Sequence, residues 1–236
     1  VTSTNDVAVE LARSGAREGT VVVAEEQTRG RGRLGRTWYS PPRCGLWFSI
    51  VLKPPLSGAD IVTVSLAVAL GVVEVLRDRY GVRAELKWPN DVVVNSKKIC
   101  GILAEGDFVI RHVQFVIVGV GVNVLNDEQD FPEDIRTIAT SLKLETGETP
   151  SRSRILADLL EGIERRYLSL CDRGFAAIRD EIVGLSSLMG KLVRVTTVKD
   201  EIVGVVQDID EAGRLVIRKE NGAHERILAG DVRRLL

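Results

Sequence analysis

Residues 29–36, RGRGRLGR, place four arginines and three glycines between two apolar runs, VVVA at 21–24 and GLWFSIVLK at 45–53. Both runs have the β-branched content of buried strands, so we expect the arginines to lie in a loop between strands. Glycine lets a backbone approach a ligand closely, and guanidinium groups bind phosphate and carboxylate in bidentate fashion. The segment therefore predicts an anion-binding loop, although the loop alone does not identify its ligand.

The glycines at 30, 32 and 35 also fit the G-x-G-x-x-G pattern of dinucleotide-binding folds. That fold needs a helix directly after the glycines and an acidic residue about 20 positions later. Here TWYSPP follows at 37–42, which is hostile to a helix, and lysine and two prolines stand at 53–55. A solvated basic loop or an RNA contact would also account for the arginines, but the formal net charge of −1 argues against a dedicated nucleic-acid binder.

The composition of the whole chain predicts one large and one small globular domain, since it has 236 residues, 44% hydrophobic and 28% charged. Its three cysteines are odd in number and widely spaced, so we expect reduced thiols and a cytoplasmic protein. No signal peptide is visible, and the longest uncharged helical run, 61–73, is shorter than the about 20 residues of a bilayer span. Because the chain begins with Val1, the sequence leaves open whether an upstream strand or DNA-binding domain precedes it.

Apolar periodicity predicts an α+β fold, with a mixed, largely antiparallel sheet and packed helices. Helices are expected at 7–16, at 61–80 with Asp60 as the cap, at 155–170 and at 175–183. Strands are expected at 21–26, 45–53, 84–87, 91–95, 98–105 and 114–123, with turn residues at 95–96 and 106–107. The strands from residue 84 onward are predicted to form an antiparallel meander.

The residue pattern changes at residue 191, where short segments of alternating apolar and polar residues begin. These segments predict the strands of a small β-barrel. Residues 184–190 are predicted as a linker, so the expected domains are residues 1–184 and 190–236. The barrel segment contains no aromatic residue, and its nine basic side chains nearly balance eight acidic ones. We therefore do not expect it to be a nucleic-acid module.

A second cluster of polar residues lies in KWPNDVVVNSKKICGILAE, residues 87–105. Lys87 and Lys98 are separated by a predicted strand–turn–strand, so their ammonium groups could face one ligand. Pro89 holds the preceding residue in extended geometry. An amide such as that of Asn90 can hydrogen-bond a base edge, and a carboxylate such as that of Asp91 can hold Mg²⁺. Together with the arginine loop, the cluster predicts a site for a phosphate-rich substrate without a Walker A lysine.

Five segments of the chain resemble the biotin–protein ligase family. They are STN at 3–5, EEQTRGRGRLGRTW at 25–38, KWPND at 87–91, KKICGIL at 97–103 and GVGVNV at 119–124, in the order found in the family. The terminal barrel is similar to the SH3-like domain of that family. The related lipoate–protein ligases use a different glycine motif, RRxSGG, which is absent here. The resemblance implies a class II synthetase-like biotin/lipoate ligase catalytic fold followed by an SH3-like barrel.

The resemblance also implies a two-step reaction with ATP, biotin and Mg²⁺. Biotin would first be activated to biotinoyl-5′-AMP, and a lysine of a biotin carboxyl carrier protein would then displace AMP. By this resemblance biotin would be bound by Ser3, Thr4, Asn5, Gln27, Arg31, Gly32, Arg33 and Lys98. ATP would be bound by Arg33, Arg36, Trp38, Lys87, Asn90, Asp91, Lys98 and Asn123. The catalytic residues would be Lys98, Arg33 and Asp91, with Asp91 also as the metal ligand.

The expected partner is thus the carrier protein, with no membrane and no nucleic acid for these residues, and with a homodimer as a possible assembly. An alternative of another class is a sensor that binds biotin or its adenylate without transferring it. Because a pure binder needs neither Arg33 nor Lys98 at the reacting centre, their joint presence favours catalysis.

Overall fold

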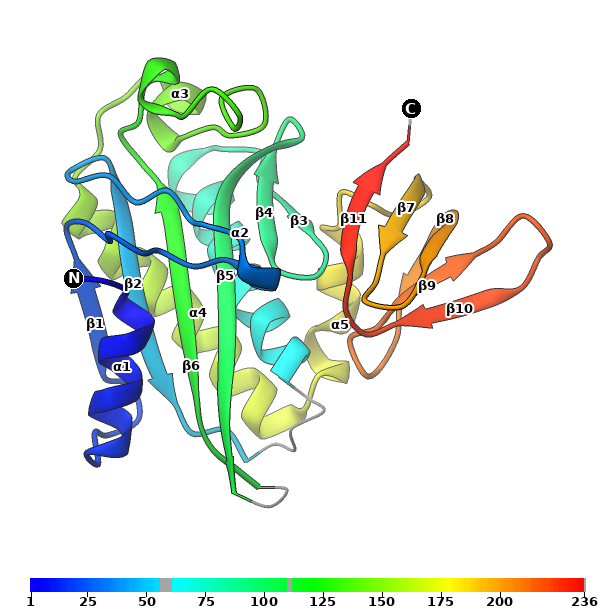
Figure 1. Cartoon of the computed structure of the whole chain (residues 1–236), viewed down its shortest axis with the longest axis horizontal. Helices are drawn as coiled ribbons and strands as arrows, with labels where there is room; N and C mark the ends of the chain where they lie inside the picture. The colour runs from blue at the N-terminus through cyan, green and yellow to red at the C-terminus, as the bar shows by residue number, and fades with distance from the viewer. Residues whose placement is uncertain (56–60, 110–111, 236) are drawn as a thin grey trace.

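Two antiparallel sheets organise the chain in the computed structural model, which describes residues 1–55, 61–109 and 112–235. The larger sheet has the strand order β1-β2-β6-β5-β4-β3, and the smaller sheet has the order β10-β9-β8-β7-β11 (Figure 1). The predicted α+β class, with antiparallel strands and packed helices, is confirmed. The strands of the larger sheet are β1 (Val21–Ala24), β2 (Gly45–Leu52), β3 (Glu85–Lys87), β4 (Asp91–Val94), β5 (Lys97–Val109) and β6 (His112–Asn123).

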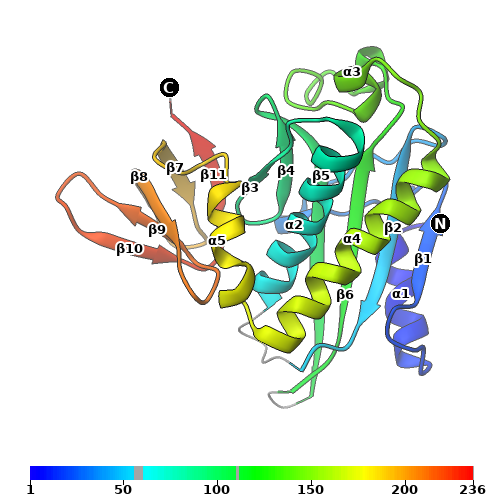
Figure 2. The same ribbon diagram turned by 180° about the vertical axis from the view of Figure 1, so that it is seen from behind.

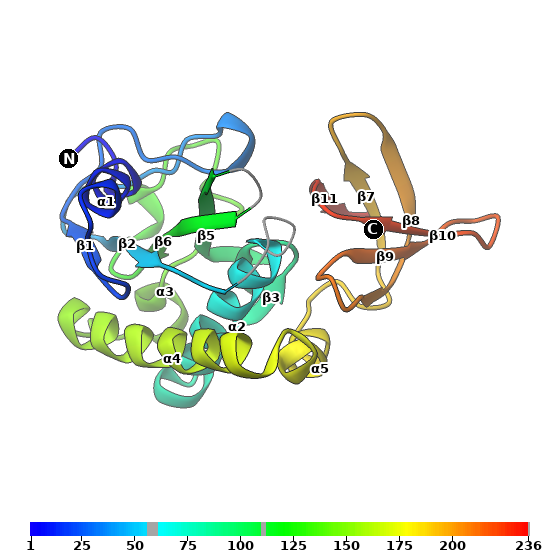
Figure 3. The same cartoon turned by 90° about the horizontal axis from the view of Figure 1, so that it is seen from below.

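Helices cover both faces of the larger sheet. The first face carries α1 (Thr4–Arg13), which begins at Ser3, whose side chain accepts a hydrogen bond from the Asn5 amide. The opposite face carries α2 (Ile61–Tyr80) and α4 (Arg152–Arg173), as Figures 2 and 3 show. These two helices approach closely at Gly71 and Gly162, where an added Cβ would overlap the neighbouring backbone. The sheet therefore has helices on both sides, and all eight residues of β2 are buried.

Alternation along β2 assigns its side chains to two hydrophobic clusters. Phe48, Ile50 and Leu52 join the large core beneath α2 and α4, whereas Val51 packs with Ala8 and other residues under α1. The larger core continues into the C-terminal barrel. Burial of this apolar surface is the main force that holds the helices on the sheet.

The structure departs from the predicted elements at the first helix and at one turn. The helix predicted at 7–16 spans Thr4–Arg13 instead, because Ser3 provides its N-cap. Gly106 and Asp107 were expected to form a turn, but both residues pair with β6, and β5 continues to Val109 after a register shift between Asp107 and Phe108. The prediction was wrong because pairing along β6 outweighs the turn preference of a glycine–aspartate pair. The predicted turn at Asn95 and Ser96 is confirmed, since both residues have positive φ. The predicted cap Asp60 lies outside the described residues.

Among the described residues, three short helical segments and one longer helix also belong to the larger domain. The arginine loop contains η1 (Arg33–Gly35), and the segment after β6 contains η3 (Glu128–Asp130) and α3 (Leu142–Thr146). The helix α5 (Ala176–Gly184) follows α4 and leads to the barrel. None of the helices in the described ranges has the combination of length and apolarity that crossing a membrane requires.

The C-terminal barrel lies beside the β3 edge of the larger sheet, with β11 on the side nearer to β3 and β4 (Figure 1). Its strands are β7 (Leu192–Thr196), β8 (Glu201–Ile209), β9 (Leu215–Arg218), β10 (His224–Ile227) and β11 (Asp231–Arg234). The connecting residues also hydrogen-bond to the sheet, because the Leu86 amide donates to Leu185 and the Ser187 amide donates to Leu86. The connection is thus held against β3.

Candidate active site

A cavity of about 810 Å³ opens on the face of the larger sheet that also carries α1. Its floor comes from β5 and β6, one wall from the arginine loop and another from the end of the barrel. All fourteen residues that the sequence indicated as site residues line this cavity: Ser3, Thr4, Asn5, Gln27, Arg31, Gly32, Arg33, Arg36, Trp38, Lys87, Asn90, Asp91, Lys98 and Asn123. Five distant sequence segments thus meet at one place, while the role of each residue stays a prediction.

Three glycines hollow the floor of the cavity. Gly101 of β5 pairs directly with Gly121 of β6, and the Trp38 ring lies over both. A Cβ on Gly121 would overlap the Trp38 indole, and one on Gly119 would overlap the Asn5 amide. Only glycine leaves room for these side chains, so the spacing of GVGVN along one strand face shapes the site.

Lys98 lies at the centre of the cavity. Its Nζ is 2.6 Å from Oδ1 of Asp91 and 5.0 Å from the centroid of the Trp38 ring. The side chain is one-third exposed, so the ion pair is reachable from the cavity. The neighbouring Lys97 is exposed, as expected for adjacent residues on opposite faces of a strand. An ammonium held in this way can offset negative charge that develops on a bound substrate.

The arginine loop closes on itself through backbone hydrogen bonds. The Gly32 amide donates to the Arg36 carbonyl at 2.7 Å, and the Trp38 amide donates to the Gly30 carbonyl at 2.9 Å. Between them Leu34 adopts a left-handed conformation with φ of 56° and is exposed. The loop therefore has a defined shape that projects its arginine side chains in different directions.

Three arginines of this loop contact three different parts of the structure. Arg31 pairs with Asp6 of α1 at 2.7 Å, and this hydrogen bond raises the pKa of its guanidinium. Arg33 donates to Oδ1 of Asn90 at 3.3 Å. Burial lowers the pKa of Arg33, but an arginine remains protonated at neutral pH. A half-buried guanidinium with a single weak partner is suited to bind an anion from the cavity.

Arg36 contacts the C-terminal barrel. Its two terminal nitrogens donate to the two carboxylate oxygens of Asp231, at 3.1 and 2.8 Å. The bidentate hydrogen bonds raise the pKa of Arg36 and lower that of Asp231. Asp231 is the first residue of β11, so this pair links the arginine loop directly to the barrel.

Small polar side chains form the end of the cavity near α1. The Thr4 amide and hydroxyl both donate to Oε1 of Gln27, at 2.8 and 3.0 Å. The Asn5 side chain donates to Glu105 at 2.6 Å and accepts a hydrogen bond from Ser49 at 2.6 Å. These groups are held in fixed orientations and offer donors and acceptors for a neutral polar ring.

The amides predicted for the nucleotide end have protein partners. The Asn90 side chain donates to the Ile102 carbonyl at 2.6 Å, and the Asn123 side chain donates to the Thr140 carbonyl at 3.0 Å. Asn90 also accepts from Arg33, so it orients that guanidinium. Lys87 lies opposite Asp91 in the β3–β4 register and lines the same wall.

Sequence reasoning missed several residues of the site. Glu105 binds both Asn5 and Arg31, yet it reads as one of many charged residues in the sequence. Ser49 lies inside an apolar strand, where a single buried hydroxyl was the signal that could have indicated it. The barrel contributes Asp231 and the segment after β6 contributes Ile138, both without a local motif.

The described part of the chain contains no group of three or more histidine, cysteine, aspartate or glutamate residues arranged to hold a metal ion. Asp91 is one of the carboxylates that line the cavity, and it is paired with Lys98. A metal held by protein groups alone therefore does not fit these residues. A Mg²⁺ that arrives on nucleotide phosphates and takes one carboxylate does fit them.

Comparison with known proteins identifies the family. The model of the biotin/lipoate A/B protein ligase family matches residues 1–123, just over half of the chain, and that of the biotin protein ligase C-terminal domain matches residues 188–234. The chain belongs to the biotin–protein ligase family. The recognition made from the five sequence segments is confirmed, and so is the assignment of an SH3-like barrel.

Relatives and solved structures agree with this membership. The bifunctional ligase/repressor BirA of Bacillus subtilis is 34% identical over 232 residues, which are 98% of this chain and 71% of that protein. The biotin–[acetyl-CoA-carboxylase] ligase of Mycobacterium tuberculosis is 36% identical over 239 residues, covering 98% of this chain and 85% of that protein. The structure of biotin protein ligase from Aquifex aeolicus with biotin and ATP superimposes with a TM-score of 0.87, 31% identity and coverage of 99% and 95%. This family member is a ligase enzyme.

Proposed function

We propose that this biotin–protein ligase activates biotin with ATP to biotinoyl-5′-AMP and transfers the biotinoyl group to a lysine of a biotin carboxyl carrier protein. The observation that carries the proposal is the convergence of Lys98, Asp91 and Arg33 in the cavity whose other end is formed by fixed neutral groups. In this proposal residues 1–184 form the catalytic domain and residues 190–236 the C-terminal domain. The cavity separates a cationic end for phosphates from a neutral polar end for a cyclic urea.

The neutral end suits biotin. Biotin's ureido ring has two N–H donors and one carbonyl acceptor, and the Thr4, Asn5 and Gln27 side chains offer the complementary groups. The acceptors and donors are already oriented by protein partners, so little conformational entropy is lost on binding. In the proposal Ser3 and the Gly32 backbone complete this end, and Arg31 faces the biotin carboxylate.

The first step joins two anions. A biotin carboxylate oxygen attacks the α-phosphorus of ATP, the bond from that phosphorus to the β-phosphate oxygen breaks, and pyrophosphate leaves. The repulsion between carboxylate and phosphate is offset by Arg33 and Lys98, which act where the negative charge concentrates. Lys98 is held near the reacting centre by Asp91 before substrate binds, so only a short turn of its side chain is required to reach the reacting oxygens.

The nucleotide would extend toward the wall that Arg36, Trp38 and Lys87 share with the barrel. In the proposal Trp38 covers the adenine, while Asn90 and Asn123 shape the pocket around it. Asp91 would hold the Mg²⁺ that accompanies ATP, which offsets phosphate charge when it is bound.

The second step needs an acceptor amine. The neutral ε-amino group of the carrier lysine attacks the carbonyl carbon of the mixed anhydride, the bond from that carbon to the phosphate oxygen breaks, and AMP leaves. The proton lost by the amine passes to solvent or to a nearby base. Lys98 again stabilises the negative charge on the departing phosphate.

The cellular setting belongs to the same proposal. Acetyl-CoA carboxylase ligases are named among the relatives, so the acceptor that we propose is the carrier domain of a biotin-dependent carboxylase. Cys44, Cys100 and Cys171 are unpaired in the structure, consistent with the cytoplasm that we propose as its location. We also propose that the chain can form a homodimer and that these residues bind neither membrane nor nucleic acid.

Two measurements test the function. Pyrophosphate release should require both biotin and ATP, and a streptavidin blot of a carrier domain should become positive after incubation with the protein, biotin and Mg·ATP. A carrier domain whose acceptor lysine is replaced by arginine should stay unlabelled. Binding of biotin without pyrophosphate release would instead support the non-catalytic sensor.

A further inference from the structure

Trp88 connects the KWPND turn of the cavity with the C-terminal barrel. It lies between Lys87 and Pro89, in the turn that joins β3 to β4, and it is 1% exposed. Its indole Nε1 donates a hydrogen bond of 2.9 Å to the carbonyl of Gly213, in the turn between β8 and β9. A buried indole N–H needs an acceptor, and here the acceptor belongs to the barrel.

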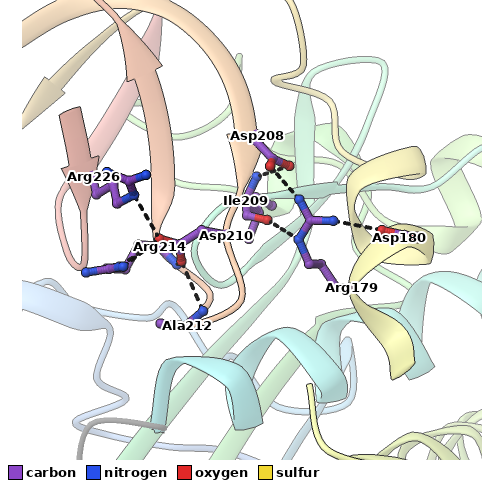
Figure 4. Close-up of polar contacts among 8 residues, drawn as sticks. All are labelled: Arg179, Asp180, Asp208, Ile209, Asp210, Ala212, Arg214 and Arg226. Atoms are coloured by element: carbon purple, nitrogen blue, oxygen red, sulfur yellow. Dashed lines mark hydrogen bonds and ion pairs between the residues drawn. The ribbon is translucent and has the colours of Figure 1, made fainter. Parts of the chain in front are cut away.

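Asp210 fixes the conformation of the β8–β9 turn, residues 210–214 (Figure 4). Its Oδ1 accepts from the backbone amides of Ala212 and Arg214, both at 3.0 Å, and its Oδ2 accepts from Arg214 Nε at 2.8 Å. Arg226 approaches the same oxygen at 3.5 Å. One carboxylate thus holds both the backbone of the turn and two side chains, so the Gly213 carbonyl has a defined direction.

The turn is also wedged against the catalytic domain. Gly213 has φ of 73°, and a Cβ there would lie 3.1 to 3.2 Å from side-chain atoms of Val62, Thr63 and Leu66 on α2. A residue with a side chain would meet both the unfavourable conformation and the helix. The close approach of the turn to α2 therefore requires glycine.

Arg179 of α5 anchors the strand that enters the turn (Figure 4). Its Nε donates to the Ile209 carbonyl at 2.7 Å, and its Nη2 bonds the Asp208 carboxylate. Its third contact, with Asp180, is exposed and contributes little. The β8–β9 turn is thus held by α5 on one side and by α2 on the other.

The KWPND turn connects the contact between Trp88 and the barrel with the wall of the cavity. Two residues after Trp88, the Asn90 side chain accepts a hydrogen bond from Arg33, and the next residue, Asp91, binds Lys98. A shift of the Trp88 ring would move the backbone of this three-residue turn and with it both contacts. Of the groups on this wall, the proposed function assigns Asn90 and Asp91 to ATP alone, whereas the biotin end is built on α1 and the loop between β1 and β2.

We propose that the β8–β9 turn, held by Asp210, is a positioning element that acts through Trp88 on the ATP side of the cavity. The inference rests on the proposed function. Neither Asp210 nor the Gly213 carbonyl lines the cavity, so the turn acts without touching substrate. The barrel thus affects the reaction through this turn as well as through the Arg36–Asp231 pair.

Steady-state pyrophosphate release in the full-length protein tests this, with KM measured separately for ATP and biotin. Trp88→Phe keeps an aromatic ring but removes the N–H donor, and Asp210→Ala frees the turn. Each should raise the KM for ATP about tenfold, the size expected for one buried hydrogen bond, and leave the KM for biotin unchanged. Asp210→Asn keeps an acceptor for both backbone amides and should stay near wild type. Glu211→Ala, an exposed change in the same turn, is the matched control.

Combining Trp88→Phe with Asp210→Ala gives the decisive comparison. If the turn acts through Trp88, the second substitution adds little to the first, whereas independent effects would multiply and overturn the proposal. Equal losses for ATP and biotin would also overturn it, since they indicate general destabilisation. Wild-type kinetics in both single variants would overturn it while leaving the ligase function intact. Failure of the proposed function would differ, because then the wild-type protein itself would release no pyrophosphate.

Discussion

Lys98 Nζ lies 2.6 Å from Oδ1 of Asp91, so the cation at the centre of the cavity is already paired and oriented in the absence of substrate. The lysine side chain of the pair is one-third exposed, and both residues line the cavity. Such an ammonium can turn to the reacting oxygens without crossing the cavity. Its carboxylate partner holds it in place between turnovers.

Replacement of Lys98 should therefore remove catalysis and spare the fold. Lys98→Ala is expected to lower the rate of biotin-dependent pyrophosphate release about 10²- to 10³-fold, the usual loss when a fixed charge at a reacting centre is removed. Lys97→Ala is the control, because Lys97 is the exposed neighbour on the other strand face. A larger loss in Lys97→Ala than in Lys98→Ala would refute the assignment.

Arg33 offers a second prediction, about retention of the intermediate. Arg33→Gly should still form some adenylate but release it into solution, since it removes the half-buried guanidinium that we propose binds the anionic intermediate, while the biotin end stays intact. The measurement is streptavidin labelling of an unrelated bystander protein added to the reaction. Arg29→Gly, at an exposed position of the same loop, should leave the bystander unlabelled. If the Arg33 variant labels only the carrier protein, Arg33 has no retention role.

Local signals in the sequence explain which parts of the site could be predicted. The arginine loop, the KWPND turn and the glycines of GVGVN each occur within a few residues, and the Asn95–Ser96 turn brings Lys98 back along β4, opposite Val93 and within reach of Asp91. Strand alternation then gave the correct face for Lys98 and the opposite one for Lys97. Such features depend on neighbours in the chain, which a sequence displays.

Contacts between distant residues could not be predicted in this way. Glu105 meets Asn5 across 100 positions, and Arg36 meets Asp231 across 195. No local pattern distinguishes Asp231 from the other acidic residues of the barrel, because its role depends on how the barrel docks. The extension of β5 past Gly106 has the same origin, since pairing with β6 decides it.

The Arg36–Asp231 pair predicts that the stability of the folded protein decreases at acidic pH. Its hydrogen bonds lower the pKa of Asp231 in the folded state, so the carboxylate contributes stability that is fully present above the ordinary aspartate pKa of about 3.9. That contribution is lost as the pH falls through the lower folded-state pKa. Asp231→Asn should therefore lower the midpoint of thermal unfolding at pH 6. The difference in midpoint between this variant and the wild type should disappear below the folded-state pKa of Asp231, where the wild-type carboxyl group is also neutral.

The pH series has a matched test in the partner residue. Arg36→Gln should reproduce the same loss of stability at pH 6, because the pair is broken from its other side. Asp180→Asn, at an exposed position, should leave the pH dependence of the unfolding midpoint as in the wild type. If the stability difference between wild type and Asp231→Asn stays constant from pH 6 to acid, the pair does not stabilise the folded state.

The glycine floor beneath Trp38 gives the final prediction. A Cβ at Gly121 would overlap the Trp38 indole, and one at Gly101 would lie 2.9 Å from that ring and 3.0 Å from Cε of Lys98. Gly121→Ala should therefore displace Trp38 from the floor and lower adenylation, with a change in tryptophan fluorescence and a retained circular dichroism spectrum. Gly101→Ala should act on both Trp38 and Lys98 and lower the rate further.

Gly184→Ala is the control, because a Cβ there meets no atom within 4 Å and the residue ends α5 away from the cavity. The side chain that moves should be the one over the floor, so Trp38→Phe should abolish the fluorescence change that Gly121→Ala causes. Unchanged adenylation in both floor variants would mean that Trp38 need not lie against the glycines for catalysis. A loss of activity without any fluorescence change would instead place the effect of the added methyl group on the substrate rather than on Trp38.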